Sequence, residues 1–156
     1  MPKFVIGTDL PGSSDVQALL EVHLAFTQRQ SPPEDVHVLD VAGLLAANVS
    51  FFSIRVNGEL LGVGALKHLD AVQAEIKSMH TAEGARGRGV ARALLDYLVA
   101  TARARGCGRV SLETGSMAAF APARALYASA GFEVCEPFGE YAPSPHSVFM
   151  ELELDR

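Results

Sequence analysis

The most constraining feature of the chain is its β-rich centre, in which two apolar runs flank Asn57-Gly58. An Asn-Gly pair between such runs is typical of a type I′ β-hairpin, because both turn residues must adopt positive φ angles. A further β-rich run, AVQAEIKSMHT at 71–81, follows the hairpin. We therefore expect a meander of three strands. This argues against a dinucleotide-binding βαβ unit, in which strands alternate with helices.

A short strand and a helix are expected before this centre. The run KFVIGT at 3–8 predicts the strand. Residues 13–26, SSDVQALLEVHLAF, carry apolar side chains at helical spacing. Ser14 is followed three residues later by Gln17, as in a capping box, so we expect Ser14 to cap this helix.

Two prolines separate this helix from a second, shorter one. The run SPPE at 31–34 interrupts the helical pattern, because proline lacks the backbone donor that a helix interior needs. We expect the second helix within DVAGLLAAN at 40–48. Asp40 is its predicted N-cap, since a carboxylate can accept hydrogen bonds from the first free amides of a helix.

A long amphipathic helix follows the β-rich centre. Its apolar stripe consists of Val90, Ala91, Leu94, Leu95, Leu98, Val99 and Ala102. On the opposite side, Arg92 and Asp96 are four residues apart and can form an ion pair. Gly106 is the expected end of the helix, because glycine readily adopts the left-handed conformation found there.

The C-terminal third alternates strands with one more helix. RVSLET at 109–114 predicts a strand, APARALYASAGF at 121–132 a helix, and FMELEL at 149–154 a strand with regular alternation. A further strand is possible near 132–138. The expected order is β-α-α-β-β-β-α-β-α-β, which describes a mixed α/β protein.

Length and composition indicate one folded domain over residues 1–156. The chain has 49% hydrophobic and 20% charged residues, which is typical of a globular protein. It has no run of about 18 apolar residues, so no membrane span is predicted. The N-terminus does not resemble a signal peptide, and a cytoplasmic location is therefore the expectation.

Charge and cysteine usage exclude two kinds of partner. The net charge of -5 argues against nucleic acid, whose phosphates favour a basic surface. Cys107 and Cys135 show no CxxC spacing, and the five histidines are scattered. We therefore expect no metal site, and we expect both cysteines to be free, buried or half-buried thiols.

The glycine- and arginine-rich segment before the long helix predicts an anion site. A helix begins with amides that have no intrahelical partner, and these attract phosphate groups. Gly87 and Gly89 allow the backbone to approach a ligand closely. The segment lacks the GK[ST] of a P-loop. A solvated turn between strand and helix is the alternative interpretation.

Two motifs give the chain a resemblance to a known family. RGRGVA at 86–91 fits the pattern Q/R-x-x-G-x-G/A, and LYASAGF at 126–132 follows in the right order. The chain resembles the GNAT acyltransferases over nearly its whole length, and a small bacterial (YsnE-like) subgroup in particular. The resemblance implies a GNAT fold with a mixed, mostly antiparallel sheet of six to seven strands and about four helices. This sheet would be splayed between strands 4 and 5.

The resemblance also implies a co-substrate, acetyl-CoA, and no metal. The pyrophosphate would be held by the loop, at Arg86, Gly87, Arg88, Gly89, Val90, Ala91 and Arg92. The pantetheine arm would pair with the backbone of Met79 and Thr81 on the preceding strand. The Met79 amide would polarise the thioester carbonyl, as an oxyanion donor does.

Glu75 is the predicted general base, because similar proteins carry a glutamate at this offset before the loop. Strand alternation predicts Glu75, Lys77 and Met79 on one side of the strand. An ion pair with Lys77 would be a purely structural role for Glu75. Glu113, His80 and a water chain remain alternatives for the base.

Tyr127 is the predicted general acid, since the family commonly places a tyrosine beside the CoA sulfur. Its alternative role is that of a core aromatic. Many relatives have asparagine seven residues before this tyrosine, and here that position is Phe120. Without this amide, the polar contact with the pantetheine arm would be missing, or it would be supplied by Ser116 or by backbone groups.

These expectations describe an N-acetyltransferase that acts on the amine of a small, amino-acid-like molecule by direct transfer in a ternary complex. The alternative is a catalytically silent module that binds or senses acyl-CoA. The acceptor would contact residues 24–40 and 136–149, where Tyr141 and His146 have no assigned role. Similar proteins are often homodimers, but no stripe on this sequence indicates an interface.

Overall fold

The computed structural model describes residues 3–33 and 40–154, and its centre is a seven-stranded sheet in the order β1-β2-β3-β4-β5-β7-β6. All neighbouring strands are antiparallel except β4 and β5, which are parallel. The strands are β1 (Val5–Thr8), β2 (Val49–Val56), β3 (Glu59–His68), β4 (Gln73–Thr81), β5 (Arg109–Gly115), β6 (Glu133–Cys135) and β7 (Ser147–Glu153).

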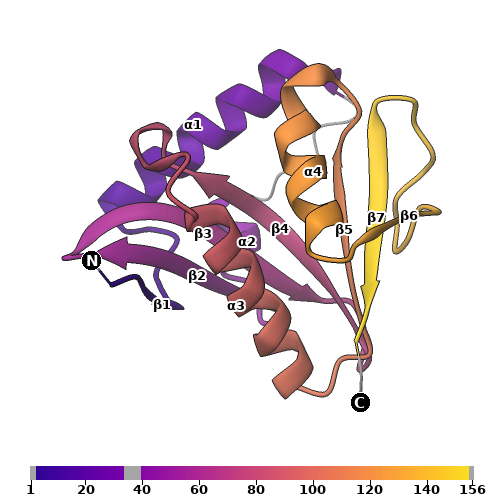
Figure 1. Cartoon of the computed structure of the whole chain (residues 1–156), viewed down its shortest axis with the longest axis horizontal. Coiled ribbons are helices and arrows are strands. Elements are labelled where there is room, and N and C mark those ends of the chain that lie inside the picture. The colour runs from indigo at the N-terminus through magenta and orange to yellow at the C-terminus, as the bar shows by residue number, and fades with distance from the viewer. Residues whose placement is uncertain (1–2, 34–39, 155–156) are drawn as a thin grey trace.

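Helices cover both faces of this sheet (Figure 1). They are α1 (Ser14–Gln30), α2 (Val41–Leu44), α3 (Val90–Ala104) and α4 (Ala121–Ser129), with short 3₁₀ turns η2 (Glu83–Ala85) and η3 (Ala118–Phe120). One apolar core forms between the sheet and α3 and α4, and a smaller one lies under α1 and α2. The predicted mixed α/β architecture is therefore confirmed.

Local signals in the sequence explain most element boundaries. Asn57 and Gly58 have φ angles of 51° and 82°, which confirms the type I′ hairpin between β2 and β3. The Asp40 side chain accepts a 2.8 Å hydrogen bond from the Gly43 amide, which confirms that cap. The prediction for Ser14 is wrong, because the cap position is Ser13 and its side chain makes no capping bond.

The apolar stripe of α3 packs into the larger core. Val90, Leu94, Leu95 and Leu98 are each at most 1% exposed. Burying a leucine side chain of this kind contributes about 1.5–3 kcal/mol to folding. Ala91 differs from the other members of the stripe, because it is half-buried and faces a cavity that is described below.

Strands β4 and β5 pair over only part of their length. Their register runs from Gln73 opposite Arg109 to Ile76 opposite Leu112. Along these two fully described strands the pairing ends there, and the strands diverge as they continue (Figure 1). The divergence is the predicted splay, and it leaves the inner edges of both strands open to a ligand.

A β-bulge at Ser78 overturns the predicted alternation along β4. Lys77 pairs with Ala65 and His80 pairs with Val63, so β4 contains one extra residue. Ser78 accommodates it with a φ of 56°. The bulge turns Met79 toward α3, away from Glu75 and Lys77. His80 takes the position beside them that alternation assigned to Met79.

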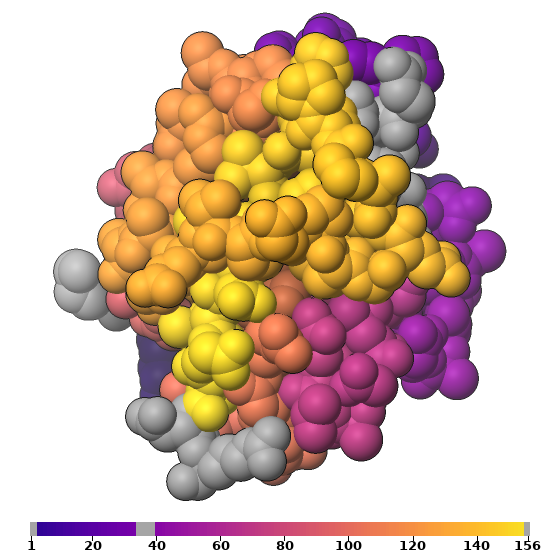
Figure 2. Space-filling model, turned by 90° about the vertical axis from the view of Figure 1, so that its right-hand side faces the viewer, coloured from indigo at the N-terminus to yellow at the C-terminus, as the bar shows by residue number. Residues whose placement is uncertain are grey.

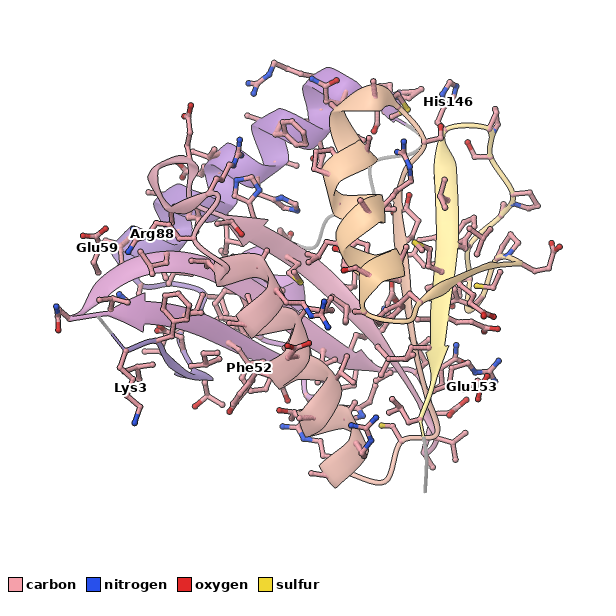
Figure 3. The ribbon with its side chains drawn as sticks, in the orientation of Figure 1. Lys3, Phe52, Glu59, Arg88, His146 and Glu153 are labelled. Carbon is pink, nitrogen blue, oxygen red and sulfur yellow. The ribbon has the colours of Figure 1, made fainter. Side chains whose placement is uncertain are left out.

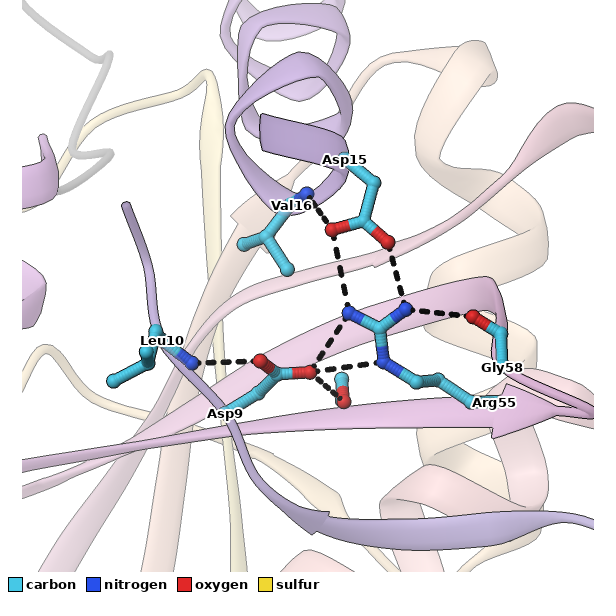
Figure 4. A network of polar contacts seen from close by, with 7 residues as sticks. Asp9, Leu10, Asp15, Val16, Arg55 and Gly58 are labelled. Atoms are coloured by element: carbon cyan, nitrogen blue, oxygen red, sulfur yellow. Dashed lines mark hydrogen bonds and ion pairs between the residues drawn. The ribbon is translucent and has the colours of Figure 1, made fainter. Parts of the chain in front are cut away.

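An arginine-centred network fixes the start of α1 on β2 (Figure 4). The Arg55 guanidinium lies 3.0 Å from Asp9 and 2.7 Å from Asp15. Burial raises the pKa of Asp9, but hydrogen bonds from Ser53, the Leu10 amide and Arg55 outweigh this and keep the pKa below its usual value. The network thereby orients α1, whose next turns face the site.

The long loop between β6 and β7 covers one end of the sheet. In Figure 2 its orange and yellow chain lies directly above the magenta surface of β3 and β4. Aromatic contacts attach it, since the Phe138 ring lies 5.2 Å from Tyr141 and 5.9 Å from Phe149 of β7. The loop therefore brings a distant segment of sequence to β4.

Candidate active site

The splay opens into a cavity of about 380 Å³, and α1, β4, β5, η3 and α4 all contribute to its walls. Of the residues predicted from the sequence, the cavity is lined by Glu75, Met79, Thr81, Arg86, Ala91 and Tyr127. Candidate catalytic groups and part of the candidate anion loop therefore face one space. The remaining loop residues lie outside this lining.

The loop before α3 presents unpaired amides beside the cavity. Gly87 and Gly89 have φ angles of 76° and 77°, which explains why glycine occupies both positions. The first intrahelical hydrogen bond of α3 runs from the Ala93 amide to the Gly89 carbonyl, at 3.0 Å. The amides that precede Ala93 are therefore available to an anion.

The three arginines of this region differ in their surroundings. Arg86 lines the cavity. Arg88 is exposed and projects from the loop (Figure 3). Arg92 forms the predicted ion pair with Asp96 at 2.9 Å and also reaches Ser129 at 3.3 Å. Arg92 is therefore already engaged on the surface of the helix.

Glu75 lies at the centre of a buried polar cluster. It is 3% exposed, and its Oε2 accepts hydrogen bonds from Tyr141 Oη at 2.5 Å and Lys77 Nζ at 3.3 Å. Lys77 also donates to the Tyr141 hydroxyl at 2.7 Å. The ion pair that was the structural alternative therefore exists. It occupies Oε2, and no described residue bonds to Oε1.

Tyr141 is the residue that the sequence interpretation missed. It lies in a loop rich in proline and glycine, so no periodicity indicated which way its side chain points. Burial and the neighbouring carboxylates of Glu75 and Glu113 raise its pKa well above the usual value. The phenol therefore stays protonated and acts as a donor. His146 lies at the start of β7 and does not line the cavity (Figure 3).

Tyr127 presents a protonated phenol to the opposite side of the cavity. It is 8% exposed, packs 5.9 Å from the Phe132 ring, and makes no side-chain hydrogen bond to a described residue. Burial raises its pKa to about 12. Tyr127 is thus both a core aromatic and a potential proton donor, so the two predicted roles are compatible.

Phe120 explains how the chain tolerates the missing asparagine. Its ring lies against the backbone of Gly115, where an added Cβ would approach a ring carbon to 2.2 Å. The opposite edge of the ring meets Phe26 of α1, with 5.3 Å between the centroids. An apolar wall therefore stands where relatives carry an amide.

Two histidines meet at the α1 side of the cavity. His23 Nδ1 and His80 Nδ1 are 3.0 Å apart, so one ring donates to the other. Burial and Arg86 lower the pKa of His80 to about 4, and burial and His80 lower that of His23 to about 3. Both rings are therefore neutral near pH 7, and His80 is a weak base.

No group of three or more potential metal ligands is found within residues 3–33 and 40–154. No helix in these ranges is long and apolar enough to cross a membrane. Part of the predicted acceptor region, 34–39, lies outside the described residues. Cys107 is buried and Cys135 half-buried, and both are free thiols as predicted.

Residues 16–132 match the Acetyltransferase (GNAT) family. The chain belongs to this family. It is therefore an acyl-CoA-dependent N-acetyltransferase, and the family predicted from RGRGVA and LYASAGF is confirmed.

Relatives of known sequence and structure agree with this family. The chain is 46% identical over 146 residues to the uncharacterized N-acetyltransferase YsnE of Bacillus subtilis, covering 94% of this chain and 96% of the relative. It is 34% identical to an IAA acetyltransferase of Azospirillum brasilense, with 99% and 100% covered. A Klebsiella pneumoniae structure, described as an acyl-CoA N-acyltransferase, has a TM-score of 0.79 and 30% identity, with 97% and 98% covered.

Proposed function

We propose that this GNAT protein moves an acetyl group from acetyl-CoA to the amine of a small molecule, by direct transfer in a ternary complex. One observation carries the proposal. A single cavity is bounded by the anion-binding loop at Arg86, by the carboxylate Glu75 and by the phenol Tyr127. Direct transfer requires both substrates to meet in one such space.

The co-substrate fits the splay and the loop. In this proposal the pyrophosphate binds the amides between Gly87 and Arg92, where the positive end of α3 adds to the attraction. The pantetheine arm lies along the open edge of β4 at Met79 and Thr81, which both line the cavity. The end of the β4–β5 pairing at Ile76 supports this placement, since it leaves the β5-facing edge of β4 unpaired from there to Thr81.

Glu75 is the proposed base. Oε2 is held by two donors, so Oε1 is the oxygen that can take a proton from the acceptor amine. Glu113 also lines the cavity and is the rival base. Tyr127 is the proposed acid, which returns a proton to the CoA thiolate as it leaves.

Direct transfer in a ternary complex is tested by initial-rate kinetics. The acetyl-CoA and amine concentrations are varied together, with release of the free thiol as the signal. A ternary complex gives intersecting double-reciprocal lines, whereas a covalent acetyl-enzyme gives parallel ones. Parallel lines would overturn direct transfer. Absence of turnover with every amine of a broad panel would overturn the amine acceptor.

The choice of base is tested with Glu75→Gln and the matched variant Glu113→Gln. The first change keeps the size of the side chain and removes its basic oxygen. We expect kcat to fall by about 10²–10⁴ for Glu75→Gln and by less than about threefold for Glu113→Gln. The reverse pattern would assign the base to Glu113. Equal, small effects would favour a water chain.

A further inference from the structure

A second cleft lies on the other side of the polar cluster. We call it the rear cleft; its volume is about 720 Å³, and its walls come from the end of β3, the start of β4 and the loop at 139–142. Figure 2 shows this loop above the magenta surface of the two strands. The rear cleft shares Glu75, Lys77 and Tyr141 with the cavity of the splay. The two spaces therefore meet at the proposed base.

Lys67 lies directly opposite Glu75 on the neighbouring strand, β3. The two residues are directly paired in the register of β3 and β4, so their side chains point to the same face. Side chains paired in this way begin about 5 Å apart. Both residues line the rear cleft.

The charges of this cluster leave Lys67 unneutralised. The Glu75 carboxylate forms its ion pair with Lys77 instead, at 3.3 Å. Glu140 lines the cleft from the loop and is exposed. Lys67 forms no ion pair with any described residue, Glu75 and Glu140 included. Lys67 is half-buried in this cleft and forms an ion pair with neither carboxylate, so its ammonium group can attract a further anion.

A further positive group strengthens this end of the cleft. His68 lines it, and the His68 ring contacts the Arg105 guanidinium at 2.9 Å between Nε2 and Nη1. Arginine has no acceptor atom, so the His68 Nε2 accepts this bond. The Arg105 charge therefore lies behind the wall that His68 forms.

We infer that the acceptor carries a carboxylate a few bonds from its amine, and that it binds in the rear cleft with the carboxylate on Lys67 and the amine at Glu75. The inference rests on the proposed amine acetylation and narrows its substrate to amino-acid-like molecules. The carboxylate of the acceptor then lies at β3, on Lys67, and its reacting amine lies at β4, beside Glu75. The nitrogen then faces the space in which the thioester lies.

The test compares two acceptors that differ only in the anchor group. A panel of amino acids and their carboxamides is assayed with acetyl-CoA, using wild type, Lys67→Met and Lys67→Arg. Wild type should give kcat/KM at least about tenfold higher for the acids than for the amides, because a charge-assisted contact is lost. Lys67→Met should remove this preference through KM, with kcat nearly unchanged. Lys67→Arg should restore most of it.

Two controls separate this inference from the proposed function. Lys3→Met removes a lysine from the exposed N-terminal segment and should leave the preference intact. Thermal melting identifies a variant that fails to fold. If wild type acetylates amides as well as acids, the carboxylate anchor is wrong while amine acetylation stands. If neither series gives turnover, the amine acceptor itself is wrong.

Discussion

The Tyr141 hydroxyl donates a 2.5 Å hydrogen bond to Glu75 Oε2 across 66 positions of sequence. This bond joins the loop between β6 and β7 to the strand that carries the proposed base. It also makes the orientation of the carboxylate depend on a residue outside the family's sequence motifs. Glu75 and Tyr141 therefore form one functional unit, and their variants should not have additive effects.

Tyr141→Phe should lower kcat by about 10- to 100-fold, since a hydrogen bond to a charged group contributes about 1.5–3 kcal/mol. The KM for acetyl-CoA should change by less than about twofold, because the Tyr141 hydroxyl bonds to Glu75 and Lys77 and not to the loop before α3. Steady-state kinetics measure both values. Tyr97→Phe, on α3, removes a hydroxyl far from Glu75 and should retain full activity. A large change in the KM for acetyl-CoA would contradict a role through Glu75.

Gly89→Asp should weaken CoA binding by at least about tenfold. The new carboxylate repels the pyrophosphate, and the φ of 77° disfavours any side chain there. Gly58→Asp is the matched control, because its φ is 82° and both glycines have open space around the missing Cβ. Calorimetric titration with CoA gives the affinity. Equal losses in the two variants would mean that backbone strain, and not the loop, is responsible.

Stability should fall between about pH 10 and 12. The pKa of Tyr127 is raised by burial to about 12 from 10.0, so the unfolded chain releases this proton first. The stabilisation is complete below pH 10 and is lost as the pH approaches 12; a shift of about two pKa units corresponds to about 3 kcal/mol. Tyr127→Phe should flatten the alkaline part of the curve. Chemical denaturation at several pH values measures it, and an unchanged slope would contradict the burial of the phenol.

Gly115→Ala should destabilise the fold by about 1–3 kcal/mol, because the new methyl group meets the Phe120 ring at 2.2 Å. Phe120→Ala in the same chain should relieve that clash and leave the double variant more stable than additivity predicts. A double-mutant cycle measured by thermal melting shows the coupling. Strictly additive effects would contradict the contact between the Phe120 ring and Gly115. The KM for acetyl-CoA of the same variants shows whether this part of the cavity wall affects co-substrate binding.

Local chemistry explains which parts of the fold were predictable. Asn57-Gly58 and Asp40 act through their nearest neighbours, so the hairpin and the cap follow directly from the sequence. The family resemblance likewise indicated Glu75 and Tyr127, and both line the same cavity. The N-cap position of α1 is Ser13 and not Ser14, a shift of one residue that propensity does not resolve, and no side-chain bond caps the helix there.

Two features of the site depend on contacts that no local pattern encodes. The bulge at Ser78 requires an extra residue opposite β3, and it reverses the sides of Met79 and His80. Strict alternation cannot predict it. The position of Tyr141 depends on its hydrogen bonds to Glu75 and Lys77, which are distant in sequence. These tertiary contacts orient the carboxylate of Glu75, the predicted base.

The short parallel pairing of β4 and β5 also has a consequence for how the chain folds. Residues up to Thr81 can form an antiparallel meander from neighbouring segments, whereas Gln73–Ile76 must find Arg109–Leu112 after α3 has crossed between them. Pairing across such a crossover is slow, because closing the connecting segment costs conformational entropy before the two strands make any stabilising contact. We expect the first four strands to assemble early, and β5, with β7 and β6 beyond it, to join the sheet later. If acyl-CoA binds between β4 and β5 as proposed, it should slow unfolding, because it would bind only after the two strands have come together.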